Sequence, residues 1–128
     1  MKAAVAGVLI LAAASASGET LSLLNDDADA EVYSIDGTGS RSGGNFQVWL
    51  LTNFKAAQPG GVKSRKRAYE IDCDARKFKV LQTYNYSGSK GEGASLSSSG
   101  AGDWKLVPPG TVIDSVRAGL CPLKAGRA

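Results

Sequence analysis

The stretch that decides the fold reads Tyr69-Glu70-Ile71-Asp72-Cys73-Asp74-Ala75-Arg76-Lys77-Phe78-Lys79-Val80. Apolar and charged residues alternate on both sides of its centre, which predicts a β-hairpin with one buried face. A turn at Asp74-Ala75 places the apolar side chains together: Tyr69, Ile71, Cys73, Phe78 and Val80. The other face then carries the opposite-charge pairs Glu70–Lys79 and Asp72–Lys77, worth about 0.2–1 kcal/mol each. A slip of one residue would break both patterns, so we expect this register.

Further strands are predicted on both sides of the hairpin. The most apolar is 45–54, which has large apolar residues on both faces and therefore suits the centre of a sheet. The Gly/Ser-rich segment 87–102 is expected to be mostly mobile loop, with a weak strand at 92–97. The expected strands are 31–36, 45–54, 62–72, 76–86 and 103–107, with residues 21–24 as an optional short first strand.

A C-terminal helix is predicted to begin after Thr111. Thr111 with Asp114 three residues later partly matches a capping box. The apolar residues that follow form one stripe, made of Val112 or Ile113, Val116 and Leu120. Pro122 is predicted to end the helix, because proline cannot donate a helical hydrogen bond. The stripe needs a sheet to cover.

The chain has two cysteines, Cys73 at the hairpin and Cys121 at the predicted helix end. Met1-Lys2, the apolar run from Ala3 to Ala14 and the small residues that follow are typical of a secretory signal peptide. In an oxidising compartment an even cysteine count predicts a disulfide. The chain-entropy model gives about 4 kcal/mol of stabilisation for so long a ring.

These patterns predict an α+β fold: a single antiparallel sheet of about five to six strands, with a C-terminal helix packed on one face and held by the disulfide. The expected segments are a signal peptide at 1–16 (with cleavage at 18 as the alternative), a flexible acidic lead-in at 17–30, a folded domain at 31–121 and a disordered tail at 122–128. The apolar run is too short to span a bilayer, and no cysteine lies near the cleavage site. We therefore expect an exported protein in the periplasm, at the cell surface or secreted, without N-terminal lipidation; its oligomeric state is open, a dimer included.

The composition argues against catalysis, cofactors and metals. Histidine is absent, which removes the commonest general base and metal ligand. Asp26, Asp27 and Asp29 lack the ligand spacing and central glycine of a calcium loop. The glycines of 37–44 lack the lysine of a phosphate-binding loop. We expect no catalytic, cofactor-binding or metal-ligating residues; a carboxylate hydrolase is disfavoured because Glu70 and Asp72 face lysines.

Positive charge gathers in the second half of the chain. Residues 17–54 hold six acidic residues and one basic residue, whereas 55–128 hold thirteen basic and six acidic residues, a balance of +7. Lys77 and Lys79 are discounted because the predicted register pairs them with acids. The remaining cluster is the candidate binding site: Lys63, Arg65, Lys66 and Arg67. It suits a protein or a polyanionic glycan, and export argues against nucleic acid; the alternative is a solvated strand edge that resists aggregation.

Trp49 is a second candidate anchor for a partner if its ring proves exposed, because tryptophan is enriched at binding hot spots. The alternative is a core tryptophan.

Several segments, in this order, resemble the surface-adhesin protein E family of bacterial envelope proteins. They cover about Phe46 to Cys121: Val-Trp-Leu-Leu-Thr-Asn-Phe at 48–54, Tyr-Glu-Ile-Asp-Cys at 69–73, Tyr-Asn-Tyr-Ser-Gly at 84–88, Trp-Lys-Leu-Val-Pro-Pro-Gly-Thr at 104–111, and Cys121. The resemblance implies a six-stranded antiparallel sheet with the helix held against its concave side by the disulfide. It also implies a non-enzymatic adhesin that binds host extracellular-matrix or serum proteins such as vitronectin and laminin.

One feature departs from that expectation. The best-known members are outer-membrane lipoproteins, and this chain has no cysteine near the predicted cleavage site. Fold transfers between relatives more safely than ligand does. The alternative function is a periplasmic inhibitor or envelope-stress module that binds an enzyme or a cell-wall component through loops such as 87–102.

Overall fold

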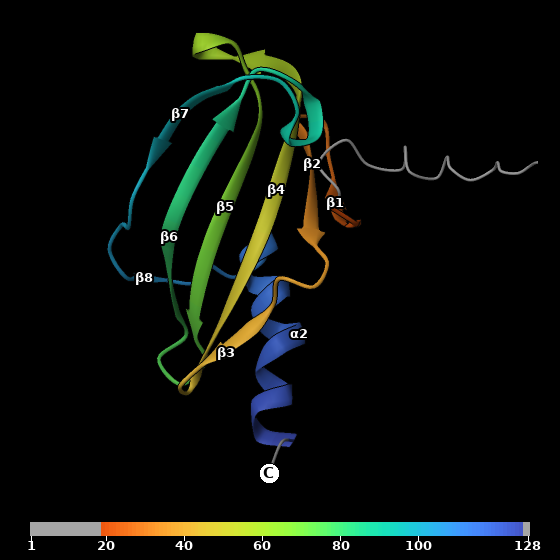
Figure 1. Ribbon diagram of the computed structural model, residues 1–128. Helices are drawn as coiled ribbons and strands as arrows, with labels where there is room; N and C mark the ends of the chain where they lie inside the picture. The colour runs from red at the N-terminus through yellow and green to blue at the C-terminus, as the bar shows by residue number, and fades with distance from the viewer. Residues whose placement is uncertain (1–18, 127–128) are drawn as a thin grey trace, which may run out of the picture.

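The computed structural model describes residues 19–126, where one curved antiparallel sheet is joined to one C-terminal helix (Figure 1). The predicted signal peptide, 1–16, lies outside the described residues. The helix α2 spans Val112–Gly126. The strands are β1 (Leu21–Asp26), β2 (Ala30–Ile35), β3 (Ser40–Ser42), β4 (Asn45–Gln58), β5 (Val62–Asp72), β6 (Lys77–Tyr86), β7 (Ser95–Ser99) and β8 (Lys105–Leu106).

The sheet has eight strands, so the expectation of five to six is wrong. Six strands form a continuous path in the order β1-β2-β4-β5-β6-β7, while β3 pairs with β4 and β8 pairs with β6. The strand β3 is three polar residues that pair with the start of β4 across a tight turn, where Gly43 adopts a φ of 63°. So short a polar strand has no apolar alternation to reveal it.

The N-terminal segment is also more ordered than expected. Residues 21–26 form the edge strand β1, paired with β2, where the sequence predicts a flexible lead-in with a short strand as the alternative. Asp27 stabilises the following turn, because its carboxylate accepts hydrogen bonds from the backbone N–H groups of Asp29 and Ala30. These bonds lower the pKa of Asp27.

The hairpin has the predicted register. Tyr69, Glu70, Ile71 and Asp72 lie opposite Val80, Lys79, Phe78 and Lys77. Beyond this point a β-bulge at Leu81 shifts the pairing, so that Ala68 lies opposite Gln82. The bulge reverses which face the following residues of β6 occupy relative to an unbroken hairpin.

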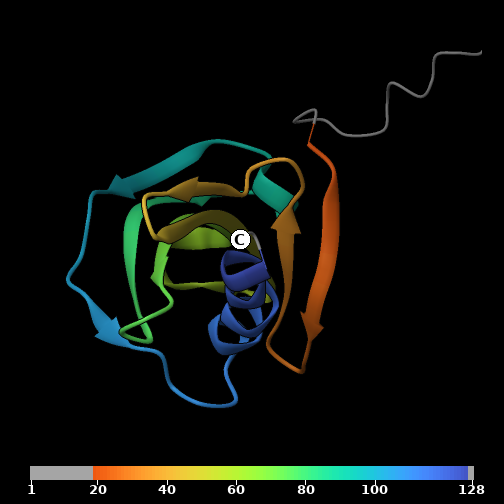
Figure 2. The ribbon, with the colours of Figure 1, turned by 90° about the horizontal axis from the view of Figure 1, so that it is seen from below.

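The helix lies inside the curve of the sheet (Figure 2). Ile113, Val116 and Leu120 pack against Val48, Leu50 and Ile71, and Ile71 is fully buried. Thr111 Oγ1 accepts a hydrogen bond from the N–H of Asp114, and the Asp114 carboxylate accepts one from the N–H of Gly110. The predicted capping residues and apolar stripe are therefore confirmed.

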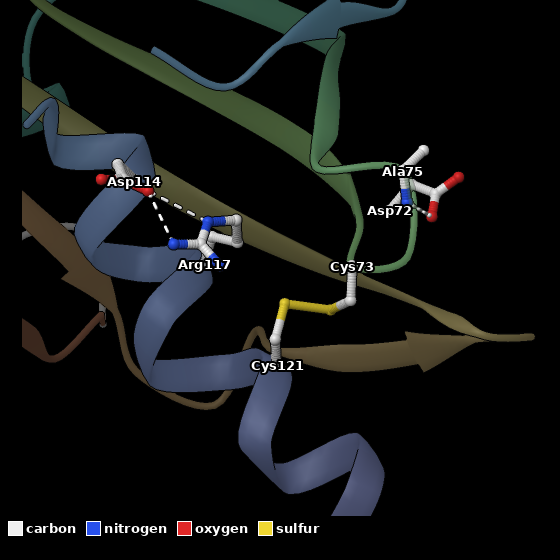
Figure 3. Close-up of a disulfide and its surroundings, with 6 residues drawn as sticks. All are labelled: Asp72, Cys73, Ala75, Asp114, Arg117 and Cys121. Carbon is white, nitrogen blue, oxygen red and sulfur yellow. Dashed lines mark hydrogen bonds and ion pairs between the residues drawn. A yellow bond between two sulfur atoms is a disulfide. The ribbon is translucent and has the colours of Figure 1, made fainter. Parts of the chain in front are cut away.

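The disulfide between Cys73 and Cys121 fastens this helix to the end of β5 (Figure 3), and the two Cα atoms are 5.6 Å apart. The helix does not end at Pro122, and residues 122–126 are helical where a disordered tail was expected. Proline loses one helical hydrogen bond, but its fixed φ is compatible with a helix, so the chain can continue at that cost. Residues 127 and 128 lie outside the described residues.

Candidate functional site

The four predicted binding cations do not share one face of the sheet. Side chains alternate along β5, so Lys63, Arg65 and Arg67 project on the face that carries the helix, whereas Lys66 projects on the opposite, outer face. The strand pairing agrees, because Arg67 lies opposite the core residue Leu50 and Lys66 lies opposite Leu51. The predicted cluster therefore divides into two separate environments.

Arg65 and Arg67 are two residues apart on β5 and are therefore neighbours on the helix-bearing face, where Arg67 lies opposite the core residue Leu50. Arg65 Nε donates to Asn85 Oδ1 at 2.7 Å, and Arg67 Nε donates to Thr83 Oγ1 at 3.1 Å. Both acceptors are neutral side chains of β6. Within residues 19–126 neither guanidinium forms an ion pair with a carboxylate.

The surroundings of Arg65 show that this is an uncompensated positive site. Burial and the nearby charge of Arg67 both lower the pKa of Arg65, burial being the larger cause. Its guanidinium also lies over the ring of Phe54, 5.2 Å from the centroid, a contact that holds the cation without neutralising it. An arginine retains four N–H donors when Nε is used, and these match the oxygens of carboxylates, sulfates and phosphates.

Lys66 is held quite differently on the outer face. Its Nζ atom is 2.7 Å from the Glu19 carboxylate and 5.5 Å from the centre of the Tyr86 ring, and the side chain is only 13% exposed. Lys66 is therefore a largely buried ion-pair partner of Glu19, and it is not part of an exposed basic patch.

Trp49 lies on this same outer face and is half-buried, which places it between the two alternatives considered for it. Its ring is stacked on Tyr84 with the planes 14° apart and the centroids 6.0 Å apart. The two rings form one wall of a pocket of about 200 Å³, which is lined by Glu19, Ile35, Thr38, Trp49, Lys66, Tyr84 and Tyr86.

The loop 87–94 is fastened to the outer face by hydrogen bonds, whereas the sequence predicts a mobile loop there. The buried hydroxyl of Ser64 donates to the carbonyl of Gly88 and accepts from the N–H of Gly91, and Asn53 accepts from the N–H of Lys90. Gly91 has a φ of 79°, and a Cβ atom there would come within 2.7 Å of the Lys66 side chain. The loop therefore seals Leu51, which is fully buried, beneath it.

Two charge assignments made from the sequence need correction. Lys77 and Lys79 lie opposite Asp72 and Glu70 as predicted, but neither lysine forms an ion pair with those acids within residues 19–126. Glu70 accepts a hydrogen bond from Asn45. The strong twist of paired strands and the length of these side chains allow such alternative partners, and Lys79 lies over the ring of Trp104.

Residues 19–126 can also be assessed for metal-binding clusters and for membrane-spanning helices. The acidic cluster near β1 has structural roles, since Asp27 caps a turn and Asp26 pairs with Lys55. Across 19–126 no three His, Cys, Asp or Glu side chains gather in a way that could hold a metal ion. Within the same range no helix has the length and apolar character needed to cross a bilayer.

The sequence does not predict that these residues come together to form a pocket. Trp49 and Leu51 signal an apolar outer face, but Tyr84 and Tyr86 reach it only because of the bulge at Leu81. Thr38 comes from a turn and Glu19 from the segment before β1, and the sequence carries no signal for either contact.

The sequence model of the surface-adhesin protein E family matches residues 21–122. No curated protein sequence matches the chain at a significant level. Three solved structures of Haemophilus influenzae protein E have the same fold. One (crystal form II) has a TM-score of 0.56 at 10% identity, covering 80% of this chain and 94% of that one. A second has a TM-score of 0.56 at 11% identity, covering 82% and 92%. A third, from a non-typeable strain, has a TM-score of 0.57 at 10% identity, covering 81% and 78%.

The family match extends over most of the chain, from β1 to the second cysteine. The chain therefore belongs to the surface-adhesin protein E family.

Proposed function

We propose that this member of the surface-adhesin protein E family is an exported, non-enzymatic envelope protein that binds acidic surfaces of host extracellular-matrix or serum proteins. Family membership supports an adhesin-type envelope protein that binds protein partners. The pair Arg65 and Arg67 on the helix-bearing face of β5 is the contact region, and Lys63 extends it along the same strand.

One observation carries this assignment: two neighbouring guanidinium groups have no carboxylate partner in the described chain. Burial, and after it the like charge of Arg67, lowers the pKa of Arg65, so the charged form of this guanidinium lacks full compensation. A bound carboxylate would relieve that repulsion and accept two parallel hydrogen bonds from a guanidinium. Arginine is also among the residues most enriched at binding hot spots.

Lys66 has no part in this contact, because it pairs with Glu19 on the other face. Trp49 is likewise excluded by its position there. The proposal therefore narrows the sequence-based cluster of four cations to three, with the two arginines as its centre.

The test is a binding measurement with purified vitronectin and laminin immobilised on a surface. The variant Arg65→Gln/Arg67→Gln should bind at least about tenfold more weakly, because hydrogen bonds to charged groups contribute about 1.5–3 kcal/mol each. The control Lys77→Gln/Lys105→Gln removes the same charge from exposed positions elsewhere and should bind like the unmodified protein.

Equal losses of affinity in the two variants would show that binding depends only on net charge. Unchanged affinity of the arginine variant would contradict the proposed site. Heparin serves as a second immobilised ligand: stronger retention on heparin than on either protein would favour a glycan as the partner. Antibody labelling of intact cells tests the location. Labelling only after the outer membrane is permeabilised would favour the periplasmic inhibitor or envelope-stress module.

A further inference from the structure

We propose that the outer-face pocket between Trp49, Tyr84 and Lys66 binds a small molecule made of one six-membered ring that carries a carboxylate. The ring would lie against the aromatic wall, and the carboxylate would take the place of Glu19 at the Lys66 ammonium. This site is on the opposite face of the sheet from Arg65 and Arg67 and is independent of the function proposed above.

The shape of the pocket selects a single ring. Its volume of about 200 Å³ lies below the 300–1,000 Å³ typical of pockets for drug-sized ligands. Trp49 and Tyr84 are half-buried and stacked with their planes 14° apart, and both rings contribute apolar surface to the pocket. Such a surface gains most by covering the flat face of a ring, since this removes apolar area on both partners from water.

The charge of the pocket selects an anion. Lys66 is 13% exposed, so its ammonium has lost most of its hydration and depends on a partner. That partner is already a carboxylate, because Glu19 Oε1 is 2.7 Å from Lys66 Nζ. Glu19 precedes β1, which begins at Leu21, and its side chain is 30% exposed where it meets Lys66. A ligand that displaces Glu19 must replace its negative charge, which excludes neutral and cationic rings.

The tethered Glu19 side chain competes with any ligand for the same ammonium. A short tether acts as a high effective concentration, in the millimolar range. Removal of the Glu19 charge should therefore strengthen binding of a carboxylate-bearing ring. The same change should leave the affinity for a neutral ring of equal size unchanged. This difference between acid and neutral ring distinguishes the proposed site.

Two sources supply this chemistry, namely sugar acids and aromatic acids. Thr38 borders the pocket and donates its hydroxyl hydrogen to the carbonyl of Ile35, so its oxygen can accept a hydrogen bond from a ligand hydroxyl. D-glucuronate and benzoate are the two probes, and methyl glucoside and benzyl alcohol are their neutral counterparts.

The experiment is a titration of the isotope-labelled full chain, followed by backbone amide chemical shifts. We expect at least one acid to shift amides of the pocket residues and to bind about tenfold or more tightly than its neutral counterpart. Glu19→Gln should raise the affinity for that acid severalfold. Lys66→Met keeps the apolar stem and removes the charge, so it should erase the difference between acid and neutral ring.

Lys77→Met is the matched control, since it removes the same charge from an exposed position on β6 and should leave both affinities unchanged. Binding of glucuronate alone identifies the sugar-acid source, and binding of benzoate alone the aromatic one. The proposal is overturned if acids and neutral rings bind Glu19→Gln equally, or if no probe shifts the pocket amides of that variant. The binding of acids and neutral rings to Glu19→Gln does not depend on Lys66→Met, so it tests the proposed site even if Lys66→Met fails to fold.

Discussion

The two faces of the sheet are buried by different means. The helix-bearing face has an aliphatic layer of Val48, Leu50 and Ile71 beneath α2, and a disulfide holds the helix there. The outer face has rings, a lysine stem and a loop fastened by hydrogen bonds to Ser64 and Asn53. The first arrangement combines apolar packing with a covalent bridge. The second leaves a half-open pocket beside the rings, so the two faces differ in how firmly their covering element is held.

Removal of the disulfide is the strongest test of this difference. The variant Cys73→Ala/Cys121→Ala should lose about 4 kcal/mol of unfolding free energy, because the bridge closes a long ring in the unfolded chain. Urea unfolding monitored by circular dichroism measures the loss. If the midpoint did not change, the helix would not depend on the bridge for its position.

Truncation of one fully buried residue on each face compares the two layers directly. Ile71 and Leu51 are both 0% exposed, on the helix-bearing and outer faces respectively. We expect Ile71→Ala to cost about 3–4 kcal/mol and Leu51→Ala about 2–3 kcal/mol, since a loop can collapse into a cavity more readily than a tethered helix can. Urea denaturation of both variants gives the comparison. An equal or larger cost for Leu51→Ala would show that the loop is as rigid as the helix.

Loss of the Ser64 hydroxyl tests how the loop 87–94 is fastened. Ser64→Ala leaves the N–H of Gly91 and the carbonyl of Gly88 without their partner, and we expect a cost of about 1–3 kcal/mol. Amide hydrogen exchange should rise in the loop and stay unchanged in α2. The control is Ser98→Ala on the exposed strand β7, and exchange that rose equally in the two variants would contradict the assigned role.

Acidification is expected to have the smallest effect on stability, and it acts on Asp114 in the first turn of α2. The hydrogen bond from the N–H of Gly110, followed by that from Arg117, lowers the pKa of Asp114 below its ordinary 3.8 (Figure 3 shows the Arg117 contact). A lowered folded-state pKa contributes stability above the unfolded-state pKa, and that stability is lost as the pH falls through the folded-state pKa. Asp114→Asn should therefore show a smaller loss of stability between neutral pH and pH values below 3.8. Unfolding curves at both pH values test this, and identical acid losses in the two proteins would contradict it.

The helix-bearing face could be predicted because its signals are local. The alternation around Asp74-Ala75 defines the hairpin, and the spacing of Val116 and Leu120 defines the helix face. The strand β1 is predicted only as an optional short strand because it is an edge strand in a polar segment, and β3 is not predicted because it has three polar residues. The separation of Lys66 from Arg65 and Arg67 follows from strand alternation alone.

The outer-face pocket could not be predicted, for two physical reasons. The bulge at Leu81 decides that Tyr84 and Tyr86 share a face with Lys66, and two consecutive apolar residues, Val80 and Leu81, are its only local trace. The contact of Glu19 with Lys66 joins residues far apart in sequence, and the basic cluster that contains Lys66 does not indicate this partner.

The position of the disulfide has a further consequence for how the protein responds to proteolysis. Cys73 and Cys121 are 48 residues apart, and the ring that they close contains β6, β7, β8 and the exposed loops between them. A protease that cuts the backbone once in these loops produces two fragments that the sulfur bridge still joins. The nicked molecule would migrate as one species on a gel until a reductant is added. The bridge therefore keeps the two fragments covalently joined after a single cut between Cys73 and Cys121.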